Sequence, residues 1–259
     1  MLNAECERLE GMLTRLKLTA IRDQLETLLD EASRRDFSLR ESLTFLCEAE
    51  VARKDQRRIA MGLSIAQFPF VRSLEDVDFE AQPSVDPKQI RELATGRRIG
   101  NGDSVLLLGP PGVGKTHLAV ALGREAIQRG YSTLFTPAAV LTANLLQAHR
   151  QGRPEERISH YGKPKLLIID ELGYLPFDPE AARLFFQLIS RRYERGSILL
   201  TSNRSVGEWA SIFSDAVVAT AILDRLLHHS HVITIRGESY RLREKRRTGL
   251  LTTAKAANT

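Results

Sequence analysis

The spacing of apolar residues predicts helices in the first part of the chain. Leucine and isoleucine recur there at helical intervals, with an interruption around residues 17–19, at Leu9, Leu13, Leu16, Ile21, Leu25, Leu28 and Leu29. Ser38 and Glu41 have the spacing of a capping box, so a second helix is predicted to begin there and to continue through Leu43, Leu46 and Val51. No strand pattern occurs before about residue 70. We therefore predict an all-helical N-terminal domain over residues 1–65, which serves partner docking or self-assembly.

The rest of the chain alternates between strand and helix patterns. Prolines at positions 69, 83 and 87 mark a connector, which places the domain boundary near residues 60–75. Beyond it, short apolar runs typical of buried strands occupy residues 105–108, 132–135, 166–169, 198–201 and 231–235. Helical patterns such as residues 179–194 separate them. This alternation predicts an α/β domain over residues 66–259, with a parallel sheet sandwiched by helices. We expect residues 219–228 and the basic tail to form a short C-terminal lid beyond the sheet.

A complete phosphate-binding P-loop follows the first predicted strand. Its sequence is Gly-Pro-Pro-Gly-Val-Gly-Lys-Thr, and it opens onto a helical pattern, which is the context that this motif requires. Glycines let the backbone approach phosphates closely, and the N–H groups at the helix start attract anions. The sequence therefore predicts a nucleoside triphosphate site formed by Gly109, Pro110, Pro111, Gly112, Val113, Gly114, Lys115, Thr116 and His117.

Two further strands end in polar residues that suit phosphate chemistry. Asp170 and Glu171 follow the run at residues 166–169, and Lys115 and Thr116 lie in the P-loop. We expect Lys115 to reach the terminal phosphates, Thr116 and Asp170 to hold Mg²⁺, and Glu171 to orient the attacking water. Asn203 follows the next strand and is expected to hydrogen-bond that water or the terminal phosphate, although an asparagine after a strand is often only a turn residue.

Composition indicates the class of protein and the compartment in which it works. Hydrophobic residues make up 42% of the chain and charged residues 27%, as in ordinary globular proteins. No apolar stretch is long enough to cross a membrane, so we expect no membrane association. Acidic residues stand where a signal peptide would carry basic ones, and two cysteines cannot form a disulfide framework. We therefore expect a cytoplasmic protein.

The positive charge is concentrated in the second part of the chain. The net charge is +5, yet residues 1–65 hold 11 basic and 12 acidic residues, whereas residues 236–247 hold six basic and two acidic ones. This excess permits nucleic-acid binding without requiring it, because a basic run is also typical of a solvated helix end.

In their order, these elements resemble the AAA+ ATPases, and within them the branch of DnaC-type helicase loaders and IstB-type transposition helper ATPases. Several strings carry the resemblance: the P-loop, Ile-Ile-Asp-Glu-Leu-Gly-Tyr-Leu-Pro at residues 168–176, Thr-Ser-Asn at 201–203, Ala-Ile-Leu-Asp-Arg-Leu-Leu-His-His at 221–229 and Gly-Glu-Ser-Tyr-Arg at 237–241. The string after the acidic pair and the histidines at 228 and 229 are closer to IstB than to DnaC.

The resemblance implies roles for three polar residues. Asn203 matches the sensor-1 position, Arg225 matches the arginine finger that enters a neighbouring subunit's nucleotide site, and Arg241 matches sensor 2. A guanidinium can neutralise charge on a transferring phosphoryl group, and supplying it from a neighbour couples hydrolysis to assembly. From the sequence alone, Arg191, Arg192 and Arg204 compete with Arg225 for the finger, and a surface ion pair is the alternative for each.

The resemblance also implies a function. We expect an ATPase that hydrolyses ATP to ADP and phosphate with Mg²⁺, in a homo-oligomer whose sites are completed by neighbouring subunits. It would assemble on double-stranded target DNA, deform it and recruit or stimulate the transposase of the same insertion sequence. A replicative helicase loader is the main alternative. A scaffold that needs ATP binding but not hydrolysis, and a small-molecule kinase, are the others.

Several residues are left with open interpretations. Arg150, Arg153, Arg191 and Arg192 are candidates for DNA contact, and residues near Asp78 and Phe79 for adenine contact. We expect Trp209 to pack in the core, and Tyr174 either to pack locally or to face a partner. The histidines at 228, 229 and 231 suggest a metal, but no cysteine or nearby acid completes a zinc set in the sequence.

Overall fold

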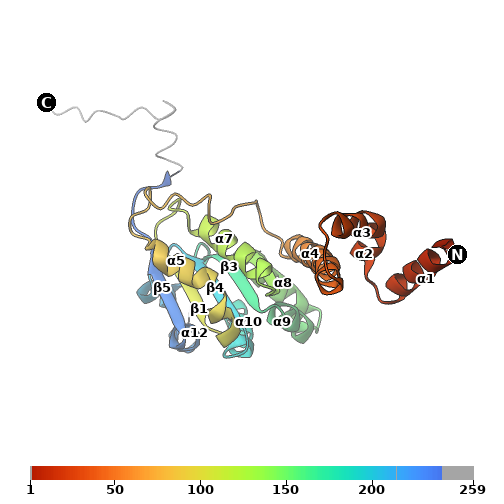
Figure 1. Cartoon of the computed structure of the whole chain (residues 1–259). Coiled ribbons are helices and arrows are strands. Elements are labelled where there is room, and N and C mark those ends of the chain that lie inside the picture. Colours follow the sequence, from red (N-terminus) through yellow and green to blue (C-terminus); the bar gives the residue numbers. More distant parts are fainter. Residues whose placement is uncertain (1, 214, 241–259) are drawn as a thin grey trace, which may run out of the picture. The chain divides into compact units, whose positions relative to one another are not determined.

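The structure of the protein, a computed structural model, describes residues 2–213 and 215–240 (Figure 1). Contacts between residues divide the chain into two compact units, Met1–Met61 and Gly62–Thr259. Among the helices described, none has both the length and the apolar composition that crossing a membrane requires.

The first unit is helical throughout its described part. It contains α1 (Leu2–Arg15), α2 (Thr19–Asp23), α3 (Leu25–Arg34) and most of α4 (Leu39–Ile65). The predicted capping box is present, because the Ser38 N–H donates to Glu41 Oε2 at 2.8 Å and the Glu41 N–H donates to Ser38 Oγ at 3.4 Å. The small core contains Leu13, Ile21 and Leu25. Leu16 and Leu29 of the predicted apolar stripe are exposed, since the chain turns at Lys17 (φ 57°) and the stripe does not continue on one face.

A buried carboxylate fastens α4 to α2 within this unit. Glu50 is 3% exposed and accepts hydrogen bonds from the N–H groups of Ala20 and Ile21, at 2.7 and 3.2 Å. Burial raises the pKa of Glu50, but these two hydrogen bonds outweigh it, with help from Lys54, and lower the pKa below its ordinary value. Glu50 therefore supplies the cap that the first turn of α2 otherwise lacks.

The second unit is built on a parallel sheet of five strands in the order β2-β3-β4-β1-β5. The strands are β1 (Ser104–Leu108), β2 (Thr133–Pro137), β3 (Leu166–Leu172), β4 (Ser197–Ser202) and β5 (Ser230–Thr234). Each overlaps one of the five predicted apolar runs, so the predicted α/β sheet is confirmed.

Helices cover both faces of this sheet (Figure 1). Side chains alternate along β1, so that Val105 and Leu107 pack with α5 (Pro87–Ala94) and α7 (Lys115–Gln128). Leu106 and Leu108 belong to the core on the other face. That core includes side chains from α8 (Ala138–Arg150), α9 (Pro154–Gly162), α10 (Pro179–Arg192), α11 (Trp209–Ile212) and α12 (Ala216–His228). Two short elements, α6 (Arg97–Asn101) and the 3₁₀ turn η1 (Val206–Glu208), complete the described set.

Residues 219–228 do not form the expected lid. They belong to α12, which buries Ala219, Ile222 and Leu226 in the core beside α10 and leads directly into β5. These apolar positions are spaced for one helix face, and the sheet needs that face as cover. The rest of the expected lid and the basic tail, residues 241–259, lie outside the described residues.

A buried arginine joins α10 to the segments that precede β3 and β4. Arg192 is 1% exposed. Its guanidinium donates hydrogen bonds to five carbonyl oxygens, those of Tyr161, Gly162, Pro164, Lys165 and Ser197. Burial lowers the pKa of Arg192 to about 10, so the group remains charged at neutral pH. The charge is solvated by peptide carbonyls instead of water.

Replacing this arginine should destabilise the second unit. We expect Arg192→Met to lower the free energy of unfolding by about 3 kcal/mol or more, because several carbonyls become buried without a donor. Urea unfolding of the full chain measures the loss. Arg191→Met is the matched control, since Arg191 makes an exposed ion pair with Glu155 at 2.9 Å and should cost less than about 1 kcal/mol. Equal losses in both variants would contradict the structural role of Arg192.

Candidate nucleotide-binding site

The strand order brings the predicted site residues to one edge of the sheet. β4 lies between β3 and β1, and the strands are parallel, so their carboxyl ends meet. A cavity of about 350 Å³ lies there, within the range of small-molecule sites. Nine of the site residues predicted from the sequence line this cavity: Pro111, Gly112, Val113, Gly114, Lys115, Thr116, His117, Glu171 and Asn203. The connector closes it with Asp78, Phe79 and neighbouring residues, and residues after β5 add Ile235 and Tyr240.

Two P-loop glycines are required by close packing as well as by backbone conformation. Gly109 and Gly112 have φ of 150° and 82°. A Cβ at Gly109 would lie 2.1 Å from the carbonyl oxygen of Ile235, and one at Gly112 would lie 2.1 Å from Ser239 Oγ. The loop therefore wraps tightly against the segment after β5 and delivers the chain into α7, whose first residue is Lys115. The N–H groups of that first turn suit a phosphate.

Lys115 is held down onto the P-loop. Its ammonium donates to the carbonyl oxygens of Gly109 and Pro110 at 2.7 and 2.8 Å, and the residue is 8% exposed. Burial lowers the pKa of Lys115, while the negative charges of Asp170 and Glu171 oppose that effect. A phosphate anion in the cavity offers the charge that the two neutral carbonyls lack, so this ammonium is suited to binding one.

Asp170 is the centre of a hydroxyl network. Its carboxylate is 5% exposed and accepts a hydrogen bond from Thr116, whose Oγ1 lies 3.0 Å from both oxygens. The Thr201 hydroxyl donates to Asp170 Oδ1 at 2.5 Å. A carboxylate and a hydroxyl oxygen side by side form a donor set that Mg²⁺ prefers, so Thr116 and Asp170 fit the predicted metal role.

Glu171 adopts an uncommon backbone conformation that turns its side chain away from Asp170. Its φ is +61°, and the pairing of β3 with β4 shifts register between Ile169 and Leu172. Such a bulge re-aims side chains beside functional sites. Asp170 therefore stays buried while Glu171 is exposed and lines the cavity, which agrees with the different roles predicted for the two acids.

Thr201 is a candidate site residue to which the sequence analysis assigned no role. Besides donating to Asp170, its hydroxyl accepts a hydrogen bond from the Glu171 N–H at 2.9 Å. One fully buried hydroxyl thus positions both acids. A polar residue at the end of the apolar run 198–200 was the available signal, but threonine also suits an ordinary strand position.

Asn203 lines the cavity, and its buried amide oxygen, Oδ1, accepts no hydrogen bond from the described residues. A buried acceptor of this kind costs free energy until a donor reaches it. Water or another donor in the cavity would satisfy it, which agrees with the predicted role of Asn203.

Arg225 lies away from this cavity. It belongs to α12, which precedes β5, and the start of β5 pairs with Ser104 at the start of β1. The P-loop follows the opposite end of β1, so Arg225 is at the other edge of the sheet. Its guanidinium lies over the Phe186 ring, 4.7 Å from the centroid, and donates to the Ala221 carbonyl oxygen.

The other predicted arginines differ in their surroundings. Arg192 is buried, so both of its proposed roles, arginine finger and DNA contact, are wrong. Arg191 and Arg204 make exposed ion pairs with Glu155 and Glu208, the alternative that we had considered for each. Arg150 and Arg153 are exposed. Arg241, the predicted sensor 2, lies outside the described residues.

The two aromatic residues considered in the sequence analysis differ in burial. Trp209 is fully buried in the core, as predicted. Tyr174 is 71% exposed at the edge of the cavity, so it does not pack in the core.

Removing the Thr201 hydroxyl should impair hydrolysis more than nucleotide binding. Thr201→Val keeps the side-chain shape but frees Asp170 and Glu171 from their shared anchor, so we expect ATP turnover at saturating ATP to fall about 10-fold or more. Affinity should change less, because the P-loop contacts remain. Steady-state hydrolysis and equilibrium binding of ATP separate the two effects. Thr201→Ser, which restores the hydroxyl, should recover most of the activity; a serine variant as impaired as the valine variant would exclude this role.

Comparison with known protein families agrees with this geometry. The family model of IstB-like ATP-binding proteins matches residues 11–248. The chain is 46% identical to a protein of Pseudomonas aeruginosa described as the ATP-binding protein of insertion sequence IS21, over 94% of this chain and 92% of that protein. It is 47% identical to the corresponding IS5376 protein of Geobacillus stearothermophilus, over 93% of this chain and 96% of that protein.

Solved structures show the same AAA+ fold at lower identity. The DnaI crystal structure is 24% identical with a TM-score of 0.54, covering 63% of this chain and 90% of that one. AMPPCP-bound DnaA from Aquifex aeolicus is 23% identical with a TM-score of 0.53, covering 73% of this chain and 59% of that one. With the family model matching most of its length, the chain belongs to the IstB-like family of insertion-sequence ATP-binding proteins.

Proposed function

We propose that this protein is an ATP-dependent regulator of transposition that assembles on duplex target DNA, deforms it and recruits or stimulates the transposase of its insertion sequence. The observation that carries the assembly step is the separation of Arg225 from the P-loop. Each subunit has the P-loop at one edge of its sheet and Arg225 at the other. A finger in this position serves a neighbouring subunit's nucleotide, so ATP would lie between subunits.

The residues of the cavity divide the hydrolytic work. Lys115 and the P-loop N–H groups hold the phosphates, and Glu171 orients the attacking water with help from the Asn203 amide. Thr116 and Asp170 would hold Mg²⁺, which neutralises phosphate charge when bound. Arg225 from the neighbour would stabilise charge in the transition state. Hydrolysis would then remove the γ-phosphate from the subunit contact and reset the complex.

Contacts with DNA and with the transposase are assigned to different surfaces. Exposed arginines of the second unit, including Arg150 and Arg153, suit phosphate contacts that depend little on sequence. Bending duplex DNA over a short site costs a few kcal/mol, which phosphate contacts from several subunits would offset. Exposed apolar side chains on α4, at Leu39, Leu43 and Val51, suit docking of the transposase or of another subunit. We expect this work to take place in the cytoplasm.

The principal alternative is a helicase loader of the DnaC type. The structural likeness to such proteins concerns the fold, whereas the relatives above 45% identity are described as insertion-sequence proteins. A loader would bind single-stranded DNA by stacking bases on exposed aromatic residues, and aromatic residues make up only 6% of this chain.

ATP should drive assembly on duplex DNA through Arg225. Sedimentation of the full chain with duplex or single-stranded DNA, with and without a non-hydrolysable ATP analogue, tests this. We expect large complexes only with duplex and nucleotide, weakened by Arg225→Ala and poorly restored by Arg225→Lys, which lacks the planar fork. DNA-stimulated ATP hydrolysis should fall on the order of 100-fold in Arg225→Ala.

Arg183→Ala is the matched control, because Arg183 is an exposed arginine on α10 that pairs with Glu180. It should assemble and hydrolyse ATP normally. Binding to single strands by a monomer that ignores duplex would instead favour the helicase loader, and full activity of Arg225→Ala would rule out the finger.

Glu171→Gln distinguishes turnover from scaffolding. The amide cannot accept the proton of the attacking water, so we expect hydrolysis to fall on the order of 100-fold while ATP-dependent assembly persists and dissociates more slowly. Complex lifetime after ATP dilution and transposition in a reconstituted reaction provide the measurements. Glu155→Gln, a change at an exposed carboxylate on α9, should leave both unchanged. Undiminished repeated transposition by Glu171→Gln would show that ATP binding alone suffices.

A further inference from the structure

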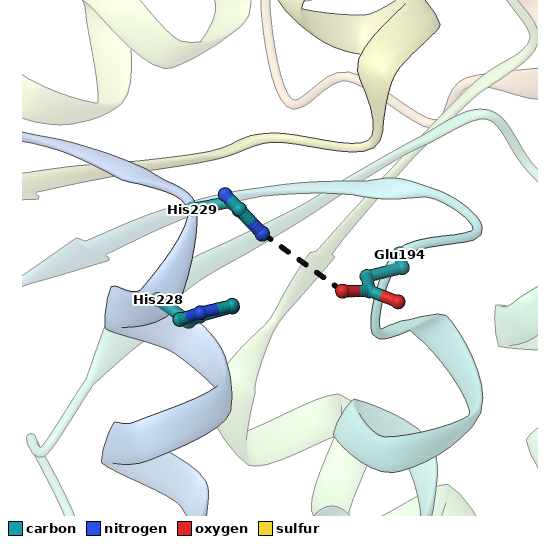
Figure 2. Close-up of side chains that lie close together, drawn as sticks. All are labelled: Glu194, His228 and His229. Carbon is teal, nitrogen blue, oxygen red and sulfur yellow. Dashed lines mark ion pairs between the residues drawn. The ribbon is translucent and has the colours of Figure 1, made fainter.

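The structure places an acid beside the histidine pair, where none was expected. Glu194, in the loop after α10, lies next to His228 at the end of α12 and His229 in the turn to β5 (Figure 2). The His229 Nε2 and Glu194 Oε1 atoms are 3.8 Å apart. From the sequence, no nearby acid completes a zinc set with these histidines, whereas the fold places Glu194 beside them. Glu194 comes from another element, and its proximity follows from the packing of α10 against α12.

We propose that Glu194, His228 and His229 bind a divalent transition-metal ion of the Zn²⁺ type. Each residue offers one ligand atom, and the three atoms lie within 4.8 Å of one another. Two imidazoles and one carboxylate are a ligand set that zinc uses with water in the fourth position. Metal–ligand bonds of about 2 Å in a tetrahedron place ligand atoms roughly 3.3 Å apart, so the site must contract on binding. All three residues are exposed, which leaves their side chains room to turn.

Tyr193 gives one histidine a defined orientation. The Tyr193 hydroxyl oxygen and His228 Nδ1 are 2.7 Å apart. When Nδ1 carries the proton and donates to that oxygen, Nε2 has its lone pair available for a metal. Because Tyr193 and Glu194 are adjacent in the chain, the same loop supplies a ligand and an outer support. An outer hydrogen bond of this kind fixes the tautomer and the ring orientation of a metal-binding histidine.

Next to the three residues lie a small hollow and several charged groups, which bear on the binding of a cation. A hollow of about 20 Å³ beside His228 is lined by Glu194, His229, Tyr193 and Arg225, and this volume is enough for roughly one water-sized particle. His228 does not line the hollow, so its ring must turn toward it on binding. The carbonyl end of α12 favours positive charge. Arg192 and Arg225 line the hollow as well, and their positive charges oppose a cation there, although the Arg192 guanidinium is directed to five carbonyl oxygens and the Arg225 guanidinium lies over Phe186. Glu194 supplies the negative charge among the residues that line the hollow, so cation binding depends on its carboxylate.

A bound ion would tie the end of α12 to the end of α10. Arg225 lies three residues before His228 on α12, so the tether would restrain the helix from which the arginine projects. This consequence for subunit coupling rests on the proposed function. The metal site itself does not, because its three ligands belong to one chain.

Metal binding is tested with Zn²⁺ alone on the untagged full chain, without nucleotide or DNA. Both cysteines are first changed to serine, Cys6→Ser and Cys47→Ser, because thiolates also bind Zn²⁺. Competition with a chromophoric chelator should show one saturable site per chain. We expect His228→Ala, His229→Ala and Glu194→Gln each to weaken it at least about 10-fold, and Tyr193→Phe to weaken it by a similar or smaller factor.

His149→Ala is the matched control. His149 is an exposed histidine that contacts a carboxylate, with its Nε2 2.8 Å from Glu180 Oε1, but it has no third ligand among the described residues. The His149→Ala variant should bind Zn²⁺ with unchanged affinity. The proposal is overturned if no saturable binding occurs, if the double variant His228→Ala/His229→Ala binds as tightly as the parent, or if His149→Ala loses as much. Circular dichroism checks that each variant is folded. Since ATP is absent, failure here leaves the proposed ATPase function untouched.

Discussion

The pairing of β4 between β3 and β1 is the constraint on which the nucleotide site depends. The register sets Leu108 opposite Ser202 and Ile169 opposite Leu200, so the P-loop, the acidic pair and Asn203 emerge side by side. None of these segments is near another in the sequence. The two apolar cores hold the three strands in place, and Arg192 secures the segments from which two of them start. The chemistry at one edge of the sheet is thus positioned by packing and hydrogen bonds along its whole length.

Sequence reasoning succeeded where a local pattern determines structure. The five strands are short apolar runs between helical patterns, and two P-loop glycines, Gly109 and Gly112, stand where close packing demands them. The capping box at Ser38 is equally local. In such cases the residues that define the feature are also the residues that form it, so their spacing contains the answer.

The remaining features depend on partners that are distant in the chain. In the sequence Thr201 is an ordinary strand residue. Its contacts with Asp170 and with the Glu171 N–H arise only when β3 pairs with β4. Arg192 resembled a surface arginine in a basic helix end, yet five carbonyls surround it. Residues 219–228 do not form the predicted lid, because the apolar face of α12 packs into the core. Spacing along one segment cannot reveal which other segment covers it.

The position of Arg225 opposite the P-loop has a geometric consequence for any assembly built on it. A contact that joins one edge of a subunit to the other edge of the next, and is not returned by that neighbour, is heterologous, and repetition of it yields a closed ring or an open helical filament. In an open filament, the P-loop of one terminal subunit faces no finger, and the finger at the other end faces no P-loop. Such a filament has a polarity, and its ends differ chemically from its interior. Growth, nucleotide turnover and partner binding at the two ends would therefore be unequal.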